Sequence, residues 1–321
     1  MGFERGSVSA ARPAGRLPVT VVGGYLGTGK TTLVNRLLRA ADGQRLAVLV
    51  NDFGVTPIDR DLIVSSSGDT LEISGGCVCC SYGSDLMDTL MTLPGQRPDI
   101  ERVVLETSGV ALPGMVASAV TLLPAYRIDG IVVMVDVETV RTMADDAYLG
   151  DTITRQLAAA DLVVANRCDL VDEASLQETL AWLAAQSPGA RLLPATRAEI
   201  APDLLLGLRD GTSPRLSATL TTPGAPDAAS LYDSLELEVP GNIDIVELGQ
   251  RLSAPGTGVL RAKGILDRVA LHVVGQRFEI DAAPAGAKSG RLVVIGLRAR
   301  LDRAAVERAV QPSLSTSLRS G

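Results

Sequence analysis

Between residues 17 and 206, short apolar runs alternate with stretches of helical spacing. Several of the runs are rich in valine and isoleucine and are apolar on both faces, which is typical of strands covered by helices on either side. The expected strands are residues 17–22, 46–50, 70–73, 102–105, 130–135, 162–165 and 191–193, and helical spacing is clear over residues 33–38, 85–93, 115–122 and 175–186. The pattern predicts an α/β domain whose mostly parallel sheet lies between helices.

A second and smaller unit follows residues 207–230, a stretch rich in Gly, Pro, Ser, Thr and Ala that predicts a linker. Its expected strands are residues 234–239, 259–266, 269–274, 277–281 and 292–297, and its expected helices are residues 243–252 and 302–310. Strands that are adjacent in sequence and joined by short turns favour a mixed or antiparallel sheet backed by helices. The predicted organisation is a flexible tail at 1–16, the α/β domain at 17–206, the linker at 207–230, an α+β domain at 231–310 and a flexible tail at 311–321.

Composition narrows the class of protein. Of the 321 residues 46% are hydrophobic but only 3% are aromatic, so aliphatic side chains must fill the core. No apolar run approaches the ~18 to 20 residues of a membrane span, and residues 1–16 lack the apolar core of a secretory signal. The net charge of −7 argues against nucleic-acid binding as the main activity. Three of the four cysteines lie within four residues, which fits a reducing cytoplasm better than a disulfide framework.

The most specific motif is G-G-Y-L-G-T-G-K-T-T at residues 23–32, between the first apolar run and a helical pattern. Strand, glycine-rich turn and helix is the context in which G-x-x-x-x-G-K-[ST] indicates phosphate binding, because the backbone N–H groups cradle phosphate oxygens at a helix N-terminus. The Lys30 ammonium would reach the β- and γ-phosphates, and the Thr31 hydroxyl would hold Mg²⁺. The alternative is an ordinary glycine turn. The nucleotide-binding residues expected here are Gly24, Gly27, Thr28, Gly29, Lys30, Thr31 and Thr32.

The motif N-R-C-D at residues 166–169 follows the apolar run 162–165, where the loops of an open α/β sheet meet their ligand. A carboxylate at Asp169 can accept from both the ring N–H and the exocyclic amine of guanine, which adenine does not present together. Asn166 can bond the far edge of the base and brace the loop, with Arg167 between them. The motif therefore favours GTP as the nucleotide. The alternative is that Asp169 caps a helix beginning at Leu170.

Further carboxylates follow other expected strands. In E-T-S-G, Glu106 can anchor Mg²⁺ through water or orient the attacking water, and Gly109 leaves room for the backbone to approach a γ-phosphate. Asp52 in N-D-F-G is likewise placed to meet nucleotide or metal, and Asp136 is a weaker candidate of the same kind. The alternative for each is a polar loop that closes a strand. Lys30, Glu106 and Asp52 are the candidate catalytic residues.

The stretch G-G-C-V-C-C carries Cys77, Cys79 and Cys80. Thiolates are soft ligands that suit zinc or copper(I), and three close together nearly fill a tetrahedral site. A lone C-x-C-C leaves one coordination position open, which suits a metal that must arrive and leave. The alternatives are a redox switch and a closed structural zinc site completed by a distant residue.

Taken together, these motifs resemble the CobW-like P-loop GTPases, a family of metal chaperones and metallocentre insertion factors. The matching stretches are G-G-Y-L-G-T-G-K-T-T, V-N-D-F-G, G-G-C-V-C-C-S, E-T-S-G-V-A-L-P, N-R-C-D-L, R-A-K-G-I-L and R-L-V-V-I-G-L, in the family's order over nearly the whole chain. The resemblance implies GTP hydrolysis with Mg²⁺, coupled to binding and release of a metal, most often zinc, at Cys77, Cys79 and Cys80. It also implies a P-loop NTPase domain and a family-specific C-terminal domain that meets a client or partner protein.

Three departures from the family pattern matter. The usual N-E-F-G-E is changed at Asp52 and Val55, which puts any accessory metal site there in doubt. The usual lysine of N-K-x-D is Arg167, which keeps the charge and the stem that cover the base. Many members carry a histidine-rich tract, whereas the single histidine here, His272, lies in an apolar run and is expected to be a sheet residue.

The leading hypothesis is a GTP-hydrolysing metallochaperone in which the segment from Asn51 to Cys80 orders around GTP and Mg²⁺ and so alters the metal site. The competing class is a GTP-gated, metal-responsive docking protein, for example one acting on the translation machinery under zinc limitation. A third reading keeps the GTPase and makes the zinc structural. The sequence does not name the client, distinguish zinc from cobalt or decide whether the chain forms a homo-oligomer.

Overall fold

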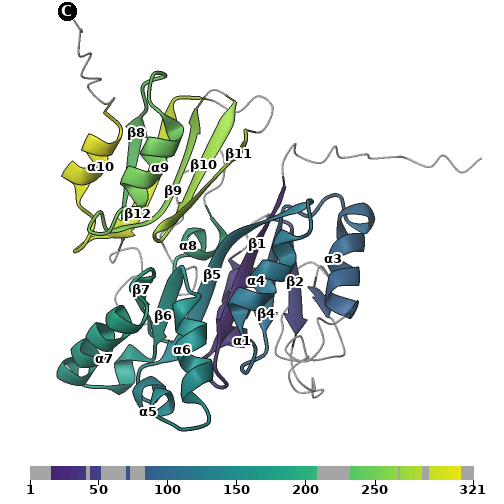
Figure 1. Ribbon diagram of the computed structural model, residues 1–321, viewed down its shortest axis with the longest axis vertical. Coiled ribbons are helices and arrows are strands. Elements are labelled where there is room, and N and C mark those ends of the chain that lie inside the picture. The colour runs from purple at the N-terminus through teal and green to yellow at the C-terminus, as the bar shows by residue number, and fades with distance from the viewer. Residues whose placement is uncertain are drawn as a thin grey trace, which may run out of the picture.

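The computed structural model describes residues 16–40, 44–51, 70–72, 84–207, 232–266, 268–283 and 289–311. Apart from residues 16, 207 and 311, the predicted tails and linker lie outside these ranges. The described chain forms two sheets, each with its own helices (Figure 1).

The first sheet is parallel throughout its described pairs, as the alternation of apolar runs predicts. Its seven strands lie in the order β3-β2-β4-β1-β5-β6-β7. Their apolar sequences are explained by burial on both faces, since every residue of β4 and β6 is buried. The strands are β1 (Leu17–Gly24), β2 (Leu46–Asn51), β3 (Thr70–Glu72), β4 (Arg102–Thr107), β5 (Tyr126–Asp136), β6 (Leu162–Asn166) and β7 (Arg191–Pro194).

Helices cover both faces of this sheet. On one face lie α1 (Lys30–Arg39) and the short α8 (Pro202–Leu206). The other face carries α3 (Ser84–Gln96), α4 (Pro113–Thr121), α5 (Val140–Ala144), α6 (Gly150–Ala158) and α7 (Glu173–Gln186). The sequence pattern predicts α1, α3, α4 and α7 but not α5, α6 or α8. Helices α5 and α8 have five residues each, too few for a clear helical period, and α6 is missed because one of its three buried residues is the polar Gln156.

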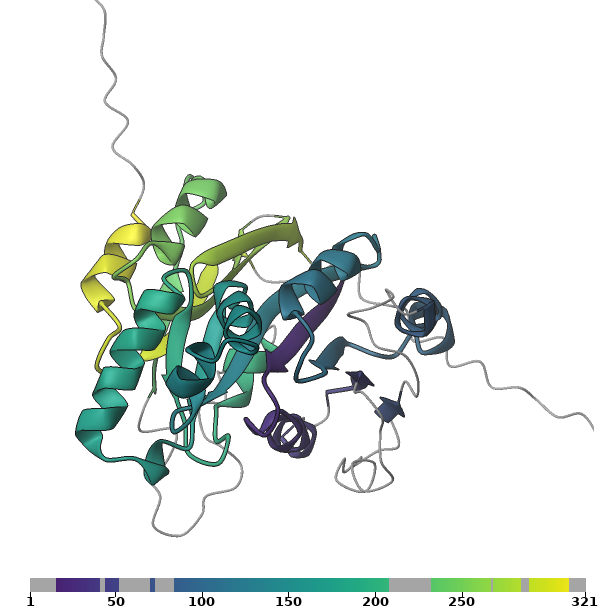
Figure 2. The ribbon, with the colours of Figure 1, turned by 60° about the horizontal axis from the view of Figure 1, so that its bottom comes forward.

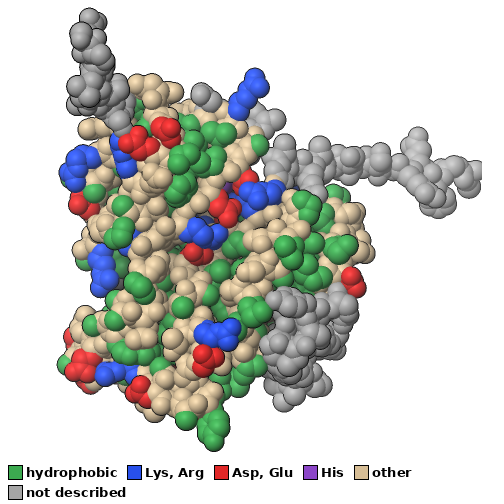
Figure 3. Space-filling model, viewed as in Figure 1, with side chains coloured by type: hydrophobic (Ala, Val, Ile, Leu, Met, Phe, Trp, Pro, Cys, Tyr) green, Lys and Arg blue, Asp and Glu red, His purple; other side chains and the backbone are tan. Residues whose placement is uncertain are grey.

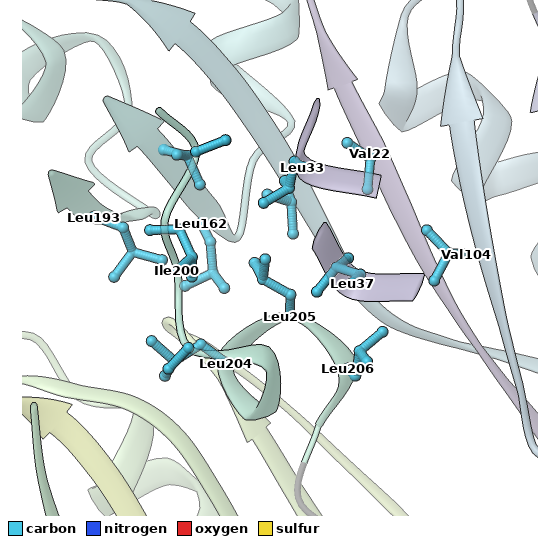
Figure 4. Packing of buried hydrophobic residues seen from close by; sticks show 14 of the residues in the cluster. Val22, Leu33, Leu37, Val104, Leu162, Leu193, Ile200, Leu204, Leu205 and Leu206 are labelled. Carbon is cyan, nitrogen blue, oxygen red and sulfur yellow. The ribbon is translucent and has the colours of Figure 1, made fainter. Parts of the chain in front are cut away.

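The largest core cluster lies under α1 (Figure 4). Leu33 and Leu37 of α1 point toward the sheet, and Leu204, Leu205 and Leu206 of α8 close the same cluster from below. Each of these leucines is at most 2% exposed, and burying one contributes on the order of 1.5–3 kcal/mol. Three consecutive buried leucines show no periodicity, so only the tertiary structure reveals that α8 belongs to this core.

The second sheet is antiparallel and has the order β11-β10-β9-β12-β8. Its helices α9 (Ile245–Ser253) and α10 (Arg303–Ala309) pack on one face. Each helix starts where an aspartate accepts backbone N–H bonds, Asp244 for α9 and Asp302 for α10. The strands are β8 (Tyr232–Glu238), β9 (Val259–Leu266), β10 (Val269–Val274), β11 (Arg277–Ala282) and β12 (Arg291–Leu297). The predicted α+β unit with a mixed or antiparallel sheet is therefore confirmed in its antiparallel form.

The second sheet packs against the edge at which the parallel strands begin (Figure 1). Buried charges join the two sheets there. Asp129 of β5 accepts from Arg102 of β4 at 2.7 Å and from Arg127 of β5 at 2.8 Å, and it pairs with Arg261 of β9 at 3.1 Å. Side-chain exposure is 2% for Asp129 and 3% for Arg261. Because this edge is occupied, the opposite edge, where the parallel strands end, is the one available to a ligand.

Two surface observations agree with the composition. None of the described helices is long and apolar enough to cross a membrane. On the face shown in Figure 3, Lys and Arg side chains are interspersed with Asp and Glu and do not gather into one basic patch.

Candidate functional site

The phosphate-binding motif forms the turn between β1 and α1, at the edge where the parallel strands end (Figure 2). Gly24, Gly27 and Gly29 have φ angles of 130°, 76° and 101°, a region that residues with a Cβ rarely adopt. Gly29 is the N-cap of α1, so the first N–H groups of the helix face the interior of the turn. A Cβ at Gly29 would lie 2.8 Å from Nδ2 of Asn166, so glycine is needed for space as well. This turn has the backbone of an anion site.

Two side chains of the motif bind back to the turn itself. The Lys30 ammonium donates to the carbonyl oxygen of Tyr25 at 2.9 Å, and the Thr28 hydroxyl donates to the same oxygen at 2.9 Å. Lys30 is only 8% exposed, and it is the first residue of α1. Its charge is thus held over the turn, where a bound polyphosphate would lie.

Thr31 and Glu106 meet although they are distant in sequence. The Thr31 hydroxyl donates to Oε1 of Glu106 at 2.9 Å, and Glu106 is 5% exposed at the end of β4. Neighbouring strands β1 and β4 bring the two residues together, since Val22 is in register with Glu106. A hydroxyl beside a carboxylate is the oxygen donor set that Mg²⁺ prefers, so these residues fit the ion that the motif implies. Thr32 is exposed on the same helical turn.

Asn166 joins the N-x-x-D loop to two other loops. It is 3% exposed, its Nδ2 donates to the Thr28 carbonyl at 3.0 Å, and its Oδ1 accepts from the Ala198 N–H at 2.8 Å. Both contacts cross from the end of β6 to other loops. Arg197 and Ala198 have φ angles of 51° and 57°, a strained turn without glycine that no sequence signal indicates. The turn after β7 is therefore part of the site.

Arg167 links the two motifs. Its Nη2 donates to the Gly27 carbonyl at 2.9 Å, and its Nη1 pairs with Oδ2 of Asp136, which is 6% exposed at the end of β5. A guanidinium can serve two acceptors at once in a fixed fork, whereas an ammonium acts as a point charge. The arginine at this position thus connects the N-x-x-D loop both to the phosphate loop and to Asp136, whose observed partner is Arg167.

Asp169 is exposed within the 3-10 turn Cys168–Leu170. The alternative reading of Asp169 as a helix cap is wrong, because the N-cap of α7 is Asp172, whose side chain accepts from the Ser175 N–H at 3.0 Å. Burial raises the pKa of the neighbouring Cys168 thiol and so disfavours its thiolate form. The exposed Asp169 carboxylate is therefore not used to cap α7.

The E-T-S-G stretch turns tightly over the phosphate loop. The Ala111 N–H donates to the Ser108 carbonyl at 3.0 Å, which closes a four-residue turn. A Cβ at Gly109 would lie 2.8 Å from the backbone nitrogen of Leu26, so only glycine permits this approach. The turn is held from α6 by Gln156, a residue for which the sequence gives no functional signal.

The predicted thiolate cluster, Cys77, Cys79 and Cys80, and the candidate Asp52 lie outside the described residues. Within the described part of the chain, no three residues among His, Cys, Asp and Glu are grouped so as to hold a metal.

His272 lies in β10, where burial and the charges of Arg127 and Lys263 hold its pKa well below the usual value. It is therefore a neutral sheet residue, as the sequence predicts.

A phosphate loop joined by Asn166 and Arg167 to an N-x-x-D loop defines the class: this is a P-loop nucleotide-binding protein with the residues of a guanine site. Residues 18–194 match the family described as CobW/HypB/UreG, nucleotide-binding domain, and residues 232–314 match the cobalamin synthesis protein cobW C-terminal domain. The chain belongs to the CobW family, which confirms the resemblance seen in its motifs, and it is a GTPase.

Similar proteins match most of the chain. The zinc chaperone CobW of a Sinorhizobium species is 31% identical, over 92% of this chain and 97% of its own. The zinc chaperone CobW of Pseudomonas aeruginosa is 30% identical, over 94% of this chain and 92% of its own. Among solved structures, the Zn(II)-bound YjiA GTPase from Escherichia coli is 22% identical with a TM-score of 0.46, over 92% of this chain and 98% of that one.

Proposed function

We propose that this protein is a zinc metallochaperone that hydrolyses GTP and transfers zinc to a client protein in a nucleotide-dependent way. The observation that carries the nucleotide part is the junction of Asn166 and Arg167 with the phosphate loop, at 3.0 Å and 2.9 Å. Support for zinc comes from the relatives of similar length that are zinc chaperones and from the soft-ligand chemistry of Cys77, Cys79 and Cys80. A reducing cytoplasm is the compartment this proposal requires, since it keeps such thiols reduced.

GTP is the substrate, and each described motif has one task. The N–H groups at the start of α1 bind the phosphates, and Lys30 exchanges its Tyr25 carbonyl for the β- and γ-phosphate oxygens. The backbone at Gly109 meets the γ-phosphate, and Asp169 accepts from the guanine N–H groups. Thr31 and Glu106 would hold Mg²⁺, whose charge offsets that of the phosphates. Arg167, the arginine that bonds the phosphate loop, is already engaged by the Gly27 carbonyl and by Asp136, so turnover by the isolated protein should be slow.

Replacing Asp169 with asparagine tests the base assignment. The asparagine amide donates where guanine also donates, but it matches the C2 carbonyl of xanthine. We expect kcat/KM for GTP to fall by about 10- to 100-fold, the range expected when a charged hydrogen bond is lost, and kcat/KM for XTP to rise. Steady-state hydrolysis of the two nucleotides measures both changes.

Asp172→Asn is the matched control for this variant. It removes the same charge three residues away, and asparagine caps a helix as well as aspartate does, so α7 keeps its N-cap. Its GTP and XTP kinetics should equal those of the wild type. An Asp169→Asn protein that keeps its preference for GTP would show that the base lies elsewhere.

The bound nucleotide should change the affinity of the protein for zinc. If the segment between the phosphate region and the cysteines responds to the γ-phosphate, zinc Kd with a GTP analogue and with GDP should differ by about 10-fold, a typical coupling. Zinc should be lost as pH falls, because thiolate ligands become protonated. Competition with a chromogenic chelator measures Kd in the GTP-analogue, GDP and nucleotide-free states.

The Cys77→Ser, Cys79→Ser, Cys80→Ser triple variant is the control, and it should lose zinc while still binding GTP. Equal zinc Kd in all three nucleotide states would refute the coupling. Chelation that unfolds the protein would instead indicate structural zinc, and zinc that is bound but never passed to an apo-client would indicate a metal-responsive docking protein.

A further inference from the structure

A buried glutamine outside the nucleotide motifs contacts the turn that follows β4. Gln156 lies on α6, is 1% exposed, and uses its amide nitrogen to donate to the Gly109 carbonyl at 3.0 Å and to the Ala111 carbonyl at 2.8 Å. Both acceptors are carbonyl oxygens, so only the NH₂ end of the side chain can serve them. A buried primary amide is costly unless it is bonded, so these two contacts fix the orientation of the side chain.

The two contacts determine which way the turn faces. A peptide group is planar, so binding the carbonyls of Gly109 and Ala111 fixes the Gly109–Val110 and Ala111–Leu112 peptide groups and with them the path of the turn. The Ala111 N–H closes the turn onto Ser108, and the Val110 N–H faces the Ser108 hydroxyl at 3.5 Å. The Gly109 N–H has no acceptor within the described part of the chain.

The turn is also fixed on its other sides. Gly109 lies against the backbone nitrogen of Leu26 in the phosphate loop, and the helix that follows the turn begins with Pro113 against Gly23 of β1. Gln156 itself lines a small pocket beneath the phosphate loop together with Tyr25 and Thr28. The glutamine therefore lies under both loops that would meet the terminal phosphate.

We infer that Gln156 is a positioning residue that holds the Gly109 turn against the phosphate loop and thereby sets the preference for GTP over GDP. It touches neither nucleotide nor metal and acts through the backbone of Gly109. This inference rests on the proposed function, because it assigns the Gly109 backbone to the γ-phosphate. GDP has no γ-phosphate, so its binding does not depend on the turn.

Gln156→Met tests the inference, because methionine keeps the volume and length of glutamine but donates no hydrogen bond. We expect Kd for GDP to stay unchanged and Kd for GTPγS to rise by about 10-fold, a change of the size usual for coupled sites. The single-turnover rate constant for GTP hydrolysis should also fall by about 10-fold. If this variant does not fold, Gln156→Asn, which draws the amide back by one methylene, is measured with the same expectation.

Ser187→Ala is the matched control. The Ser187 hydroxyl is buried and donates to the Leu157 carbonyl at 3.0 Å, so its loss perturbs the same helix without touching the turn. This variant should lose thermal stability but keep the wild-type ratio of GTPγS to GDP affinity. The inference would be overturned if Gln156→Met kept the wild-type ratio of GTPγS to GDP affinity. It would also be overturned if Gln156→Met and Ser187→Ala changed that ratio by the same factor. A wild-type protein that binds GDP and GTPγS equally would overturn this inference but not the proposed function, whereas one that binds neither nucleotide would overturn both.

Discussion

Replacing Lys30 with alanine is expected to lower kcat for GTP hydrolysis by at least about 10²-fold, the loss seen when one preorganised donor to transition-state charge is removed. Lys30 is 8% exposed and is held over the phosphate turn by the Tyr25 carbonyl, so its ammonium is in place before GTP arrives. As γ-phosphate transfer spreads charge over the phosphate oxygens, this ammonium stabilises the transition state. Single-turnover phosphate release measures the effect.

The fold should survive this change, because Lys30 is the first residue of α1 and alanine is a good helix former. Arg39→Ala is the control, since Arg39 is an exposed cation in the last turn of the same helix. It should hydrolyse GTP at the wild-type rate. Unchanged hydrolysis by Lys30→Ala would mean that the turn does not carry out the chemistry assigned to it.

Replacing Asp129 with asparagine is expected to lower the free energy of unfolding by about 3–5 kcal/mol, the usual cost of removing one partner from a buried ion pair. Asp129 carries the one carboxylate shared by Arg102, Arg127 and Arg261 at the junction of the two sheets. Removing this carboxylate would leave the positive charges of three buried guanidinium groups close together without the negative charge that they share. Urea unfolding of the full chain measures the loss.

The loss of unfolding free energy in Asp129→Asn should depend on pH in a defined direction. Burial alone would raise the pKa of Asp129, but the guanidinium groups of Arg261, Arg102 and Arg127 outweigh it and hold this pKa well below the usual 3.8. A carboxyl with a lowered folded pKa stabilises the fold above its unfolded pKa and loses that contribution as pH falls through the folded pKa. The difference between wild type and Asp129→Asn should therefore be constant from about pH 5 to 8 and shrink below about pH 4.

Asp151→Asn provides the control for charge removal. Asp151 is 81% exposed at its side chain and pairs with Arg155 at 3.5 Å, so its loss should cost less than about 0.5 kcal/mol. A difference for Asp129→Asn that is as small as this, or one that grows toward low pH, would refute the role given to the buried charges.

Much of the fold follows from local pattern. The strands β9 and β10 begin and end where the apolar runs do, and β1, β4 and β6 extend the predicted runs by one or two residues. These segments are predictable because a strand whose residues are mostly buried has a mostly apolar run at its centre. The helices α5 and α8 are missed because five residues carry no clear period, and α6 is missed because one of its three buried residues is the polar Gln156.

The candidate site divides in the same way. The sequence by itself determines the nucleotide chemistry, because a phosphate turn and an N-x-x-D loop need particular residues at fixed spacing: Lys30, Thr31 and Asn166 are identifiable from the chain alone. Asp136 and Gln156 acquire their roles from contacts with Arg167 and Gly109, which lie 31 and 47 positions away along the chain. The tertiary structure alone decided these contacts, and also that Asp129 and Arg261 meet at the far edge of the sheet, 132 positions apart. The physical reason is that a hydrogen bond or a buried ion pair depends on distance in space, and the sequence carries no periodic signal for partners brought together by separate strands and helices.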